Sequence, residues 1–368
     1  AGTSVAPSRI SGLNDVCGCP DGHAAGKRFR DLPACPEIPC LFLHITWIRP
    51  VTTCFITQPI HPRAVRFLHE QGVQTRFASQ PTMEAVIAEV GDAEAVITRD
   101  LGFSADAIAA APCLCIIACH GSGTNGIAVA AAARRGIPVT RAVNANSRSV
   151  AEMTIALMLA AARKICAADT AVRQGNWDFR YEGPGIELHG RTLALLGFGA
   201  IARHVAQIAG AGLGMKVMAW SPSVPEDVFA AHGAGRVEDI GDLLRQADVL
   251  SLHRPGDASG RPLLDRHNLS LLKPDTLIVN TSRGSAIDTQ ALRDLLVAGD
   301  LKAAALDVLP QEPPAPDEPA LSAPSLILTP HIGATTEEAL VRMAMMCVHQ
   351  IIDCLAGRTP AHVISPPA

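Results

Sequence analysis

Aromatic residues are scarce in this sequence, because Phe, Trp and Tyr together make up only 4% of its 368 residues. This scarcity disfavours the stacking platforms with which proteins bind single-stranded nucleic acid. An excess of one charge is lacking as well, since 31 Lys and Arg stand against 35 Asp and Glu, a formal net charge of -4. No large basic field is therefore available, and the sequence predicts no nucleic-acid partner.

Long apolar runs are also missing. The nearest candidate, "CLFLHITWI" at 40–48, is far shorter than the roughly 18 residues that a membrane-spanning helix needs. It lies too far from the N-terminus for a signal peptide and lacks a clear cleavage site. We therefore expect no membrane association and a cytoplasmic location.

The 11 cysteines do not form a pattern typical of a disulfide framework, because their number is odd and they are scattered. Five of them lie in apolar segments and are expected to be small core residues, namely Cys113, Cys115, Cys119, Cys166 and Cys347. Four N-terminal cysteines match no paired zinc-ligand spacing, namely Cys17, Cys19, Cys35 and Cys40. The sequence thus predicts no metal site.

The composition and periodicity of the chain divide it into three parts. Residues 1–51 are rich in Gly, Pro, Cys and Arg without helical or strand periodicity, so we expect a poorly ordered leader. From residue 52, apolar strands alternate with helices through "IPVTRA" at 137–142, a pattern typical of a parallel α/β sheet. A second such unit begins at "RTLALLGFGAIARHV", and four further apolar strands follow it up to "SLILTP".

Two long helices flank the second unit. The segment 149–165, "SVAEMTIALMLAAARKI", is apolar nearly all round and is predicted to be buried between domains or at a subunit interface. The last helix is expected at 335–357, where Thr335 and Glu338 have capping-box spacing.

A glycine-rich loop opens the second unit. Gly197 and Gly199, followed by Ala202, form the G-x-G-x-x-G/A pattern between a strand and a helix. Gly197 permits a tight turn, and Gly199 lets the backbone approach a pyrophosphate. The helix start, at Ala200 and Ile201, offers free N–H groups to its phosphates. The loop therefore predicts dinucleotide binding.

The next strand lacks the acid that usually follows it. After "KVMAW", the position that normally carries Asp or Glu for the adenosine ribose holds Ser221, followed by Pro222. A serine tolerates the 2′-phosphate of NADP, yet no arginine follows immediately, although Arg203 could swing over the loop. The cofactor is therefore expected to be NAD or NADP, with the choice open.

Three later segments together resemble the D-isomer-specific 2-hydroxyacid dehydrogenases, the family of phosphoglycerate dehydrogenase and glyoxylate/hydroxypyruvate reductase. They are "LKPDTLIVNTSRGSAIDTQAL", "AAALDVLPQEPPAP" and "LILTPHIGATTEEA", in the order and spacing of the family's signature blocks. "CHGSGTNGI" and "VNANSRSVAE" are similar to its substrate-domain loops. The resemblance covers the chain from about residue 52 to its end.

The resemblance implies three catalytic residues, Arg283, Glu312 and His331. Arg283 would hold the carboxylate and keto oxygen of a 2-oxo acid, His331 would exchange a proton with that oxygen, and Glu312 would orient the imidazole. Taken alone, each has an ordinary alternative: a surface ion pair, a solvated loop acid and a packed core histidine. The strand ends at which Arg283 and His331 stand favour the catalytic interpretation.

Further positions are implied to bind ligands. Ser122 and Gly123 would present N–H groups to the substrate carboxylate. Cofactor contacts are expected, in addition to the glycine loop and Ser221 with Pro222, from His253, Thr281, Ser282, Asp307 and Gly333. The sequence departs from the family in "HRPGDASG" at 253–260 and in "RAVN" at 141–144. There Arg254 or Arg141 could reach a phosphate or second carboxylate of the substrate, or be solvated cations.

We expect, in sum, an α/β protein of two domains. Residues 52–148 with 332–368 would form a flavodoxin-like substrate domain, and 149–331 a Rossmann-type NAD(P)-binding domain. The predicted activity is hydride transfer between NAD(P)H and a small 2-oxo acid, such as hydroxypyruvate, glyoxylate or the oxidised form of 3-phosphoglycerate, by a homodimer. The alternatives are a dinucleotide-sensing, corepressor-like binding protein of the same fold, and a formate dehydrogenase, which the Glu312 and His331 pair disfavours.

Overall fold

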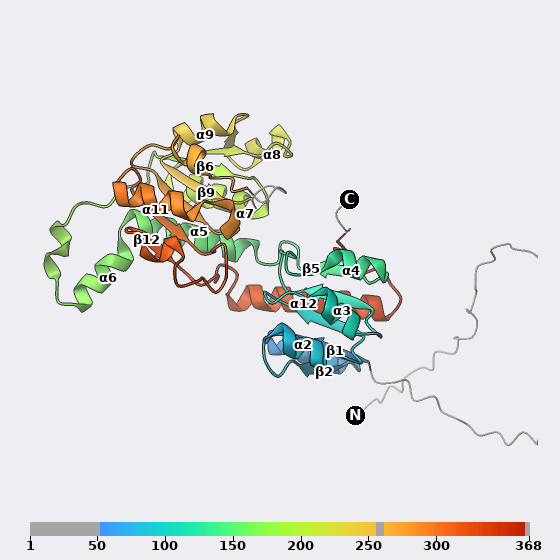
Figure 1. Cartoon of the computed structure of the whole chain (residues 1–368). Coiled ribbons are helices and arrows are strands. Elements are labelled where there is room, and N and C mark those ends of the chain that lie inside the picture. The colour runs from blue at the N-terminus through green and yellow to red at the C-terminus, as the bar shows by residue number, and fades with distance from the viewer. Residues whose placement is uncertain (1–51, 255–260, 365–368) are drawn as a thin grey trace, which may run out of the picture. The chain divides into compact units, whose positions relative to one another are not determined.

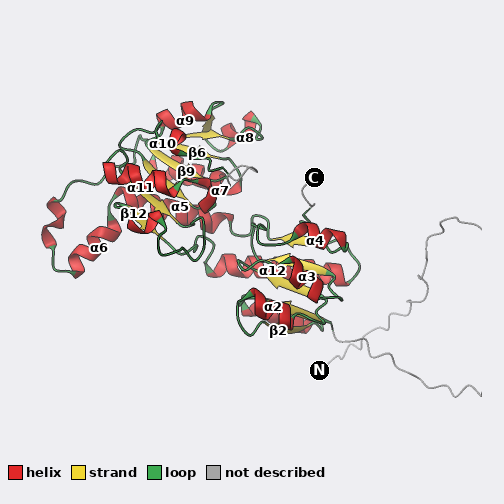
Figure 2. Ribbon diagram, in the orientation of Figure 1, coloured by secondary structure: helices red, strands yellow, loops and turns green. Residues whose placement is uncertain are grey.

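The computed structural model describes residues 52–254 and 261–364, and the predicted leader with its cysteines lies outside the described residues. The described chain builds two separate parallel sheets, one from its first five strands and one from its last seven (Figure 1). Helices cover the faces of the sheets (Figure 2), which leaves the central strands buried on both sides. The expected α/β fold class is confirmed.

The first sheet has the strand order β2-β1-β3-β4-β5, which is the flavodoxin-like order. Its strands are β1 (Thr53–Ile56), β2 (Gln74–Phe77), β3 (Ala95–Thr98), β4 (Ile116–Cys119) and β5 (Val139–Arg141). All pairs are parallel, and every residue of β3 and β4 is buried. Such strands must be apolar throughout, which explains why the sequence shows continuous apolar runs here.

The second sheet is parallel throughout and has the order β12-β11-β10-β9-β6-β7-β8, a Rossmann arrangement in which the order of successive strands reverses between β6 and β9. Its strands are β6 (Thr192–Leu196), β7 (Lys216–Trp220), β8 (Ala234–Arg236), β9 (Val249–Leu252), β10 (Leu277–Asn280), β11 (Ala303–Leu306) and β12 (Leu326–Leu328). Ligands bind at the carboxyl ends of the strands in sheets of this type, next to such a reversal.

Helices connect the strands of both sheets. Those between strands of the first sheet are α1 (Pro62–Glu70), α2 (Met83–Glu89), α3 (Ala105–Ala110) and α4 (Val129–Arg134). Those between strands of the second sheet are α7 (Ala200–Gln207), the π-helical turn η2 (Ile208–Gly212), α8 (Glu226–Ala231), α9 (Ile240–Gln246), α10 (Arg266–Leu269), the 3-10 turn η3 (Gly284–Ala286), α11 (Thr289–Ala298) and the 3-10 turn η4 (Pro319–Ser322). Every helix of the described residues is too short or too polar to cross a membrane.

Two helices join the sheets. Helix α5 (Ser147–Ala162) packs on α7 and on β10 and β11 of the second sheet, whereas α12 (Glu337–Leu355) packs on α1, β4 and β5 of the first. Their first turns meet where the Ser149 and Thr336 hydroxyls are hydrogen-bonded at 2.9 Å. The chain thus crosses between the sheets twice, and we propose the domain limits 52–148 with 332–368, and 149–331, on this basis.

The structure corrects three local predictions. Helix α12 is capped by the Thr336 hydroxyl, which accepts from the Ala339 N–H, and not by Thr335, whose own N–H closes a turn on Ile332. The helix predicted at 149–165 ends at Ala162, and a separate helix, α6 (Ile165–Arg173), begins at Ile165. Helix α6 leads into the 3-10 turn η1 (Trp177–Tyr181). Of the cysteines expected in the core, only Cys119 and Cys347 are buried, because the other three stand at the ends of their apolar segments.

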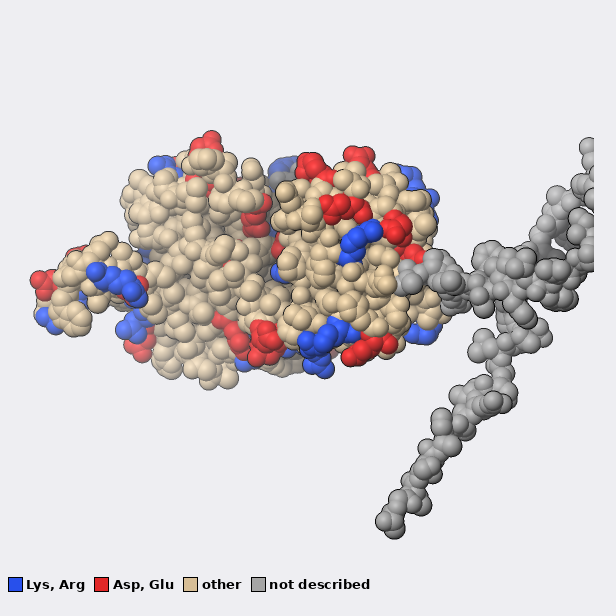
Figure 3. Space-filling model, turned by 90° about the horizontal axis from the view of Figure 1, so that it is seen from below, with Lys and Arg blue, Asp and Glu red and all other residues tan. Residues whose placement is uncertain are grey.

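The charged side chains on the face seen in Figure 3 alternate in sign. Lys and Arg lie among Asp and Glu over the described residues of that face, and neither sign covers it continuously. This distribution agrees with the near-balance of charge in the composition.

Gln350 ties the last helix to the edge of the first sheet. Its side chain is 2% exposed, and its carbonyl oxygen accepts from the Thr140 hydroxyl at 2.8 Å. Its amide donates to the backbone oxygens of Arg141 and Ala361, both at 3.1 Å. One buried side chain therefore satisfies groups on β5 and on the segment after α12.

We expect Gln350→Met to lower the free energy of unfolding by about 1–3 kcal/mol, because a side chain of similar volume leaves those buried partners unsatisfied. Urea unfolding followed by circular dichroism measures this loss. Gln290→Met is the matched control, since Gln290 is exposed and bonds only Asp294, and it should change stability by less than about 0.5 kcal/mol. Equal effects of the two substitutions would contradict the role of Gln350.

Candidate active site

A cavity of about 470 Å³ lies where strands of both sheets end. Nine of the residues predicted from the sequence line it: Ser122, Gly123, Ile201, Thr281, Arg283, Asp307, Glu312, His331 and Gly333. The other predicted positions, namely Gly197, Gly199, Ala200, Ser221, Pro222, His253 and Ser282, belong to loops after β6, β7, β9 and β10 and do not line it. The structure therefore brings the three predicted catalytic residues into one cavity.

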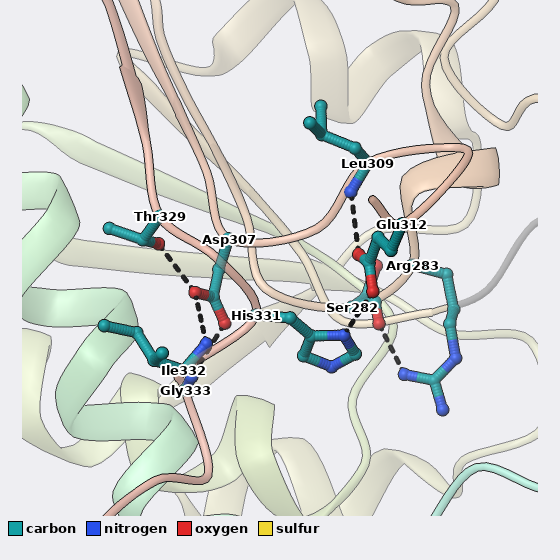
Figure 4. Close-up of polar contacts among 9 residues, drawn as sticks. All are labelled: Ser282, Arg283, Asp307, Leu309, Glu312, Thr329, His331, Ile332 and Gly333. Atoms are coloured by element: carbon teal, nitrogen blue, oxygen red, sulfur yellow. Dashed lines mark hydrogen bonds and ion pairs between the residues drawn. The ribbon is translucent and has the colours of Figure 1, made fainter. Parts of the chain in front are cut away.

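His331 and Glu312 form a hydrogen-bonded pair. The Nδ1 atom of His331 lies 2.7 Å from Oε2 of Glu312, and the other carboxylate oxygen accepts from the Leu309 N–H at 2.9 Å (Figure 4). The two side chains are 40% and 38% exposed, so the pair is reachable from the cavity. With Nδ1 engaged, Nε2 is the ring nitrogen left to exchange a proton with a bound molecule.

The backbone under His331 is held by Asp307, which is 2% exposed at the end of β11. One Asp307 carboxylate oxygen accepts from the Thr329 hydroxyl at 2.6 Å and the Ile332 N–H at 2.9 Å, and the other from the Gly333 N–H at 2.8 Å (Figure 4). His331 adopts φ +53°, a left-handed conformation that is costly for a residue with a side chain. A Cβ at Gly333 would lie 2.8 Å from the same carboxylate, so this position requires glycine.

Arg283 is positioned by the loop after β10. The buried Asn280 donates its amide to the Arg283 carbonyl at 2.9 Å and accepts from the N–H and hydroxyl of Ser282 at 2.9 and 2.8 Å. The Arg283 guanidinium donates to the Ser282 carbonyl at 2.6 Å and lies against Gly123, where an added Cβ would overlap it. Figure 4 shows the guanidinium and the His331 imidazole, and both residues line the cavity.

The loop after β4 lies directly against the Arg283 guanidinium. Among the described residues, the backbone N–H groups of Ser122 and Gly123 have no hydrogen-bond acceptor. The Ser122 hydroxyl makes only long contacts of 3.4 Å, to Ala142 and Asn146. Free N–H groups beside a guanidinium are suited to bind a carboxylate.

The glycine loop has the form that a dinucleotide requires. Gly197 has φ +95°, and a Cβ there would lie 2.9 Å from the His253 carbonyl, so only glycine fits the turn. Gly199 faces open space, and as the N-cap of α7 it makes no side-chain hydrogen bond. The first N–H groups of α7, at Ala200 and Ile201, are therefore placed to bind a phosphate. The residues present fit a pyrophosphate.

Several expected cofactor contacts already have partners within the chain. Thr281 is 8% exposed, and its hydroxyl bonds the buried Thr154 at 2.8 Å. His253 bonds the Ser251 hydroxyl at 2.9 Å, and burial lowers the pKa of this histidine to about 3, so it is uncharged at neutral pH. Ser221 is 8% exposed at the end of β7. The roles of these residues toward a cofactor stay a prediction.

Sequence reasoning missed polar residues that line the cavity from the first sheet. They are Arg99, Asp100, His120, Asn125 and Asn146. Arg99 and His120 directly follow β3 and β4, so the strand-end argument that supported Arg283 could have found them. His120 is 5% exposed, and among the residues that the structure describes neither of its ring nitrogens has a hydrogen-bond partner. Burial, and then the charge of Arg99, lower the pKa of His120 to about 4.

No group of three or more His, Cys, Asp or Glu side chains is placed to hold a metal ion within 52–254 and 261–364. Around the cavity, this part of the chain offers a cation, an acid–base pair and backbone N–H groups.

Comparison with known proteins identifies relatives. Residues 155–333 match the family described as D-isomer specific 2-hydroxyacid dehydrogenase, NAD binding domain. The chain is 38% identical to a D-3-phosphoglycerate dehydrogenase of Methanocaldococcus jannaschii, over 85% of this chain but 59% of that protein. It is 34% identical to a glyoxylate reductase of Aeropyrum pernix, over 84% of this chain and 95% of that protein. The chain thus spans less than two thirds of the first relative and nearly all of the second.

Solved structures agree. The crystal structure of an NADPH-dependent glyoxylate/hydroxypyruvate reductase from Sinorhizobium meliloti, in complex with NADP and malonate, has a TM-score of 0.75 at 27% identity. The match covers 86% of this chain and 97% of that one. With its glycine loop and its Arg283, Glu312 and His331 cavity in place, this chain belongs to the D-isomer-specific 2-hydroxyacid dehydrogenase family.

Proposed function

We propose that this chain transfers a hydride between NAD(P)H and a small 2-oxo acid, giving the D-2-hydroxy acid, and catalyses the reverse reaction as well. The observation that carries the proposal is the 2.7 Å pair of His331 with Glu312, open to the cavity that Arg283 also lines. Relatives whose names include glyoxylate reductase and hydroxypyruvate reductase support the same chemistry.

Arg283 anchors the substrate in this mechanism. Its guanidinium binds the carboxylate and the neighbouring keto oxygen of the 2-oxo acid, since its planar fork matches two oxygens at once. The free N–H groups of Ser122 and Gly123, in the loop that lies against Arg283, hold the same carboxylate. Together they orient the keto carbon and polarise its carbonyl.

His331 then moves the proton. In reduction, Nε2 gives its proton to the keto oxygen as negative charge develops there, and in oxidation it takes the hydroxyl proton. Glu312 accepts from Nδ1–H, fixes the ring orientation and stabilises the doubly protonated imidazolium. Because Leu309 holds the second oxygen of Glu312, the carboxylate cannot rotate away from the ring.

The nicotinamide cofactor supplies or accepts the hydride when bound. Gly197, Gly199 and the start of α7 would hold its pyrophosphate, and Thr281, Ser282 and Asp307 stand at the strand ends between that loop and His331. Its nicotinamide end would thus lie next to the keto carbon held by Arg283.

A reductase screen tests the proposal. Purified protein would be mixed with glyoxylate, hydroxypyruvate or phosphohydroxypyruvate and either NADH or NADPH, and absorbance at the reduced cofactor's band followed. We expect oxidation of the cofactor with at least one of these acids. If neither cofactor is oxidised with any 2-oxo acid while both bind, the chain is not a dehydrogenase.

We expect His331→Ala to lower kcat by about 10²–10⁴-fold, the usual contribution of a positioned general acid, with cofactor affinity little changed. Glu312→Gln should lower kcat less. The double substitution should be no slower than His331→Ala alone, because the two residues act as one unit. Steady-state kinetics with cofactor Kd from fluorescence titration measures all three.

A second histidine–glutamate pair serves as the control. Nε2 of His61 lies 2.8 Å from Oε1 of Glu337, outside the cavity. His61→Ala should leave kcat within about twofold of the unchanged protein, because surface pairs contribute little.

Additive losses in the His331 and Glu312 double substitution would contradict the coupled mechanism.

We also propose that the chain forms a homodimer through the arm made by α6 and η1. Figure 1 shows α6 standing away from the rest of the second sheet's helices. Large apolar side chains on this arm are exposed, namely Ile165 at 52%, Val172 at 52%, Trp177 at 65% and Tyr181 at 72%. Several large apolar side chains exposed on one short arm are typical of an interface.

Replacing Trp177 and Tyr181 together by Asp should convert the protein to a monomer, because two carboxylates would be desolvated in the interface. Size-exclusion chromatography with light scattering measures the mass. Val297→Asp is the control, since Val297 is 59% exposed on α11 and should leave the mass unchanged. A dimer that survives the double substitution would place the interface elsewhere.

A further inference from the structure

We propose that the adenosine end of the dinucleotide site is built for the 2′-phosphate of NADP, with Arg254 as its cation. This inference rests on the proposed function and deepens it by choosing between the two cofactors. The residues that carry it are Ser221 at the end of β7, Trp220 beside it, and Arg254 just after β9.

The end of β7 lacks a carboxylate. In a Rossmann fold an acid at this place binds both hydroxyls of the adenosine ribose and repels a 2′-phosphate. Here the position holds Ser221, which is 8% exposed and carries no charge. The nearest acids along the chain are Glu226, Asp227 and Glu238. Glu226 and Glu238 contact Arg236 at 3.6 and 3.0 Å, and Asp227 is exposed in the first turn of α8. The strand-end position itself thus carries no carboxylate.

Arg254 is held next to the same strand end. Its guanidinium carbon lies 5.3 Å from the centre of the Trp220 ring, at cation–π distance. The Gly197 N–H donates to the Trp220 carbonyl at 2.9 Å, and a Cβ at Gly197 would lie only 3.0 Å from Cβ of Arg254. The glycine loop, the end of β7 and Arg254 are thus mutual neighbours, where a dinucleotide places its adenosine ribose.

The charge of Arg254 is available for a ligand. Among the described residues, no acidic side chain forms an ion pair with it. The other arginines near this end already have partners within the chain, since Arg236 is paired with two glutamates and Arg203 donates to the Phe198 carbonyl at 3.1 Å. A dianionic phosphate is the ligand group that such an unpaired guanidinium favours.

A competing role for Arg254 would be a flat platform for the adenine ring. A platform would contribute equally to NAD and NADP, because both carry the same base. A phosphate-binding cation contributes only to the molecule with the 2′-phosphate. The two roles therefore separate on ligands that differ by this one group.

Isothermal titration of the full chain with 2′,5′-ADP and with 5′-AMP tests the inference without turnover. We expect the unchanged protein to bind 2′,5′-ADP more tightly. Arg254→Gln should weaken 2′,5′-ADP binding by about 10–100-fold, the range of one or two charge-assisted hydrogen bonds, and 5′-AMP binding by less than about twofold. Ser221→Asp should likewise weaken 2′,5′-ADP, by like-charge repulsion, and leave 5′-AMP bound.

Arg293→Gln is the matched control, because Arg293 bonds Ser322 next to η4 and is remote from β7 in the sheet order. It should change neither affinity. Equal losses of both nucleotides in Arg254→Gln, or equal binding of both by the unchanged protein, would overturn the 2′-phosphate site while leaving the dehydrogenase proposal standing. Failure to bind NADH, NADPH and both nucleotides would instead overturn the proposed function, and this inference with it.

Discussion

The geometry of the site depends on the buried carboxylate of Asp307. A carboxylate taken out of water must have its oxygens hydrogen-bonded, and here three donors from the β12 loop converge on it. Its own backbone carbonyl also accepts from the His331 N–H at 2.9 Å. These bonds offset the left-handed backbone of His331, which costs about 1–2 kcal/mol. The imidazole consequently leaves the chain in one direction, toward Glu312.

The other side chains proposed to be catalytic depend on this frame through close backbone packing. Gly284 lies so near the Leu309 backbone that any Cβ there would overlap it, and the Leu309 N–H in turn holds Glu312. The loop after β10, which carries Arg283, is therefore packed directly on the loop after β11, and the loop after β12 is bonded to Asp307. Three neighbouring strands of one sheet thus fix a cation, an acid and an imidazole relative to one another. This is the preorganisation that a reaction with a developing oxyanion requires.

Much of this arrangement could be predicted, because the buried strands read as continuous apolar runs and polar residues at their carboxyl ends must meet at one edge. That reasoning supported Arg283 and His331, which the family resemblance had implied. It passed over Arg99 and His120, which follow strands in the same way, although His120 lies within the segment "CHGSGTNGI". The predicted cap of α12, Thr335, was wrong by one residue. Thr335 and Thr336 are chemically alike, and only the turn that the Thr335 N–H closes on Ile332 decides between them. The arm was not predicted, because its exposed Trp177 and Tyr181 look like core residues in a sequence.

The sheet order also separates the residues proposed to transfer the proton from the residues proposed to select the cofactor. Arg283, Glu312 and His331 come from the loops after β10, β11 and β12, on one side of the reversal between β6 and β9. Ser221 follows β7 on the other side, and Arg254 follows β9 at the reversal itself. A substitution at the adenosine end is therefore expected to change which phosphate is tolerated there without moving Asp307 or the backbone it holds. The two ends are nevertheless linked through Ser282, whose hydroxyl donates to the Arg254 carbonyl at 3.2 Å and whose carbonyl accepts from the Arg283 guanidinium at 2.6 Å. Only the side chain of Arg254 can therefore be exchanged without touching the loop that carries Arg283.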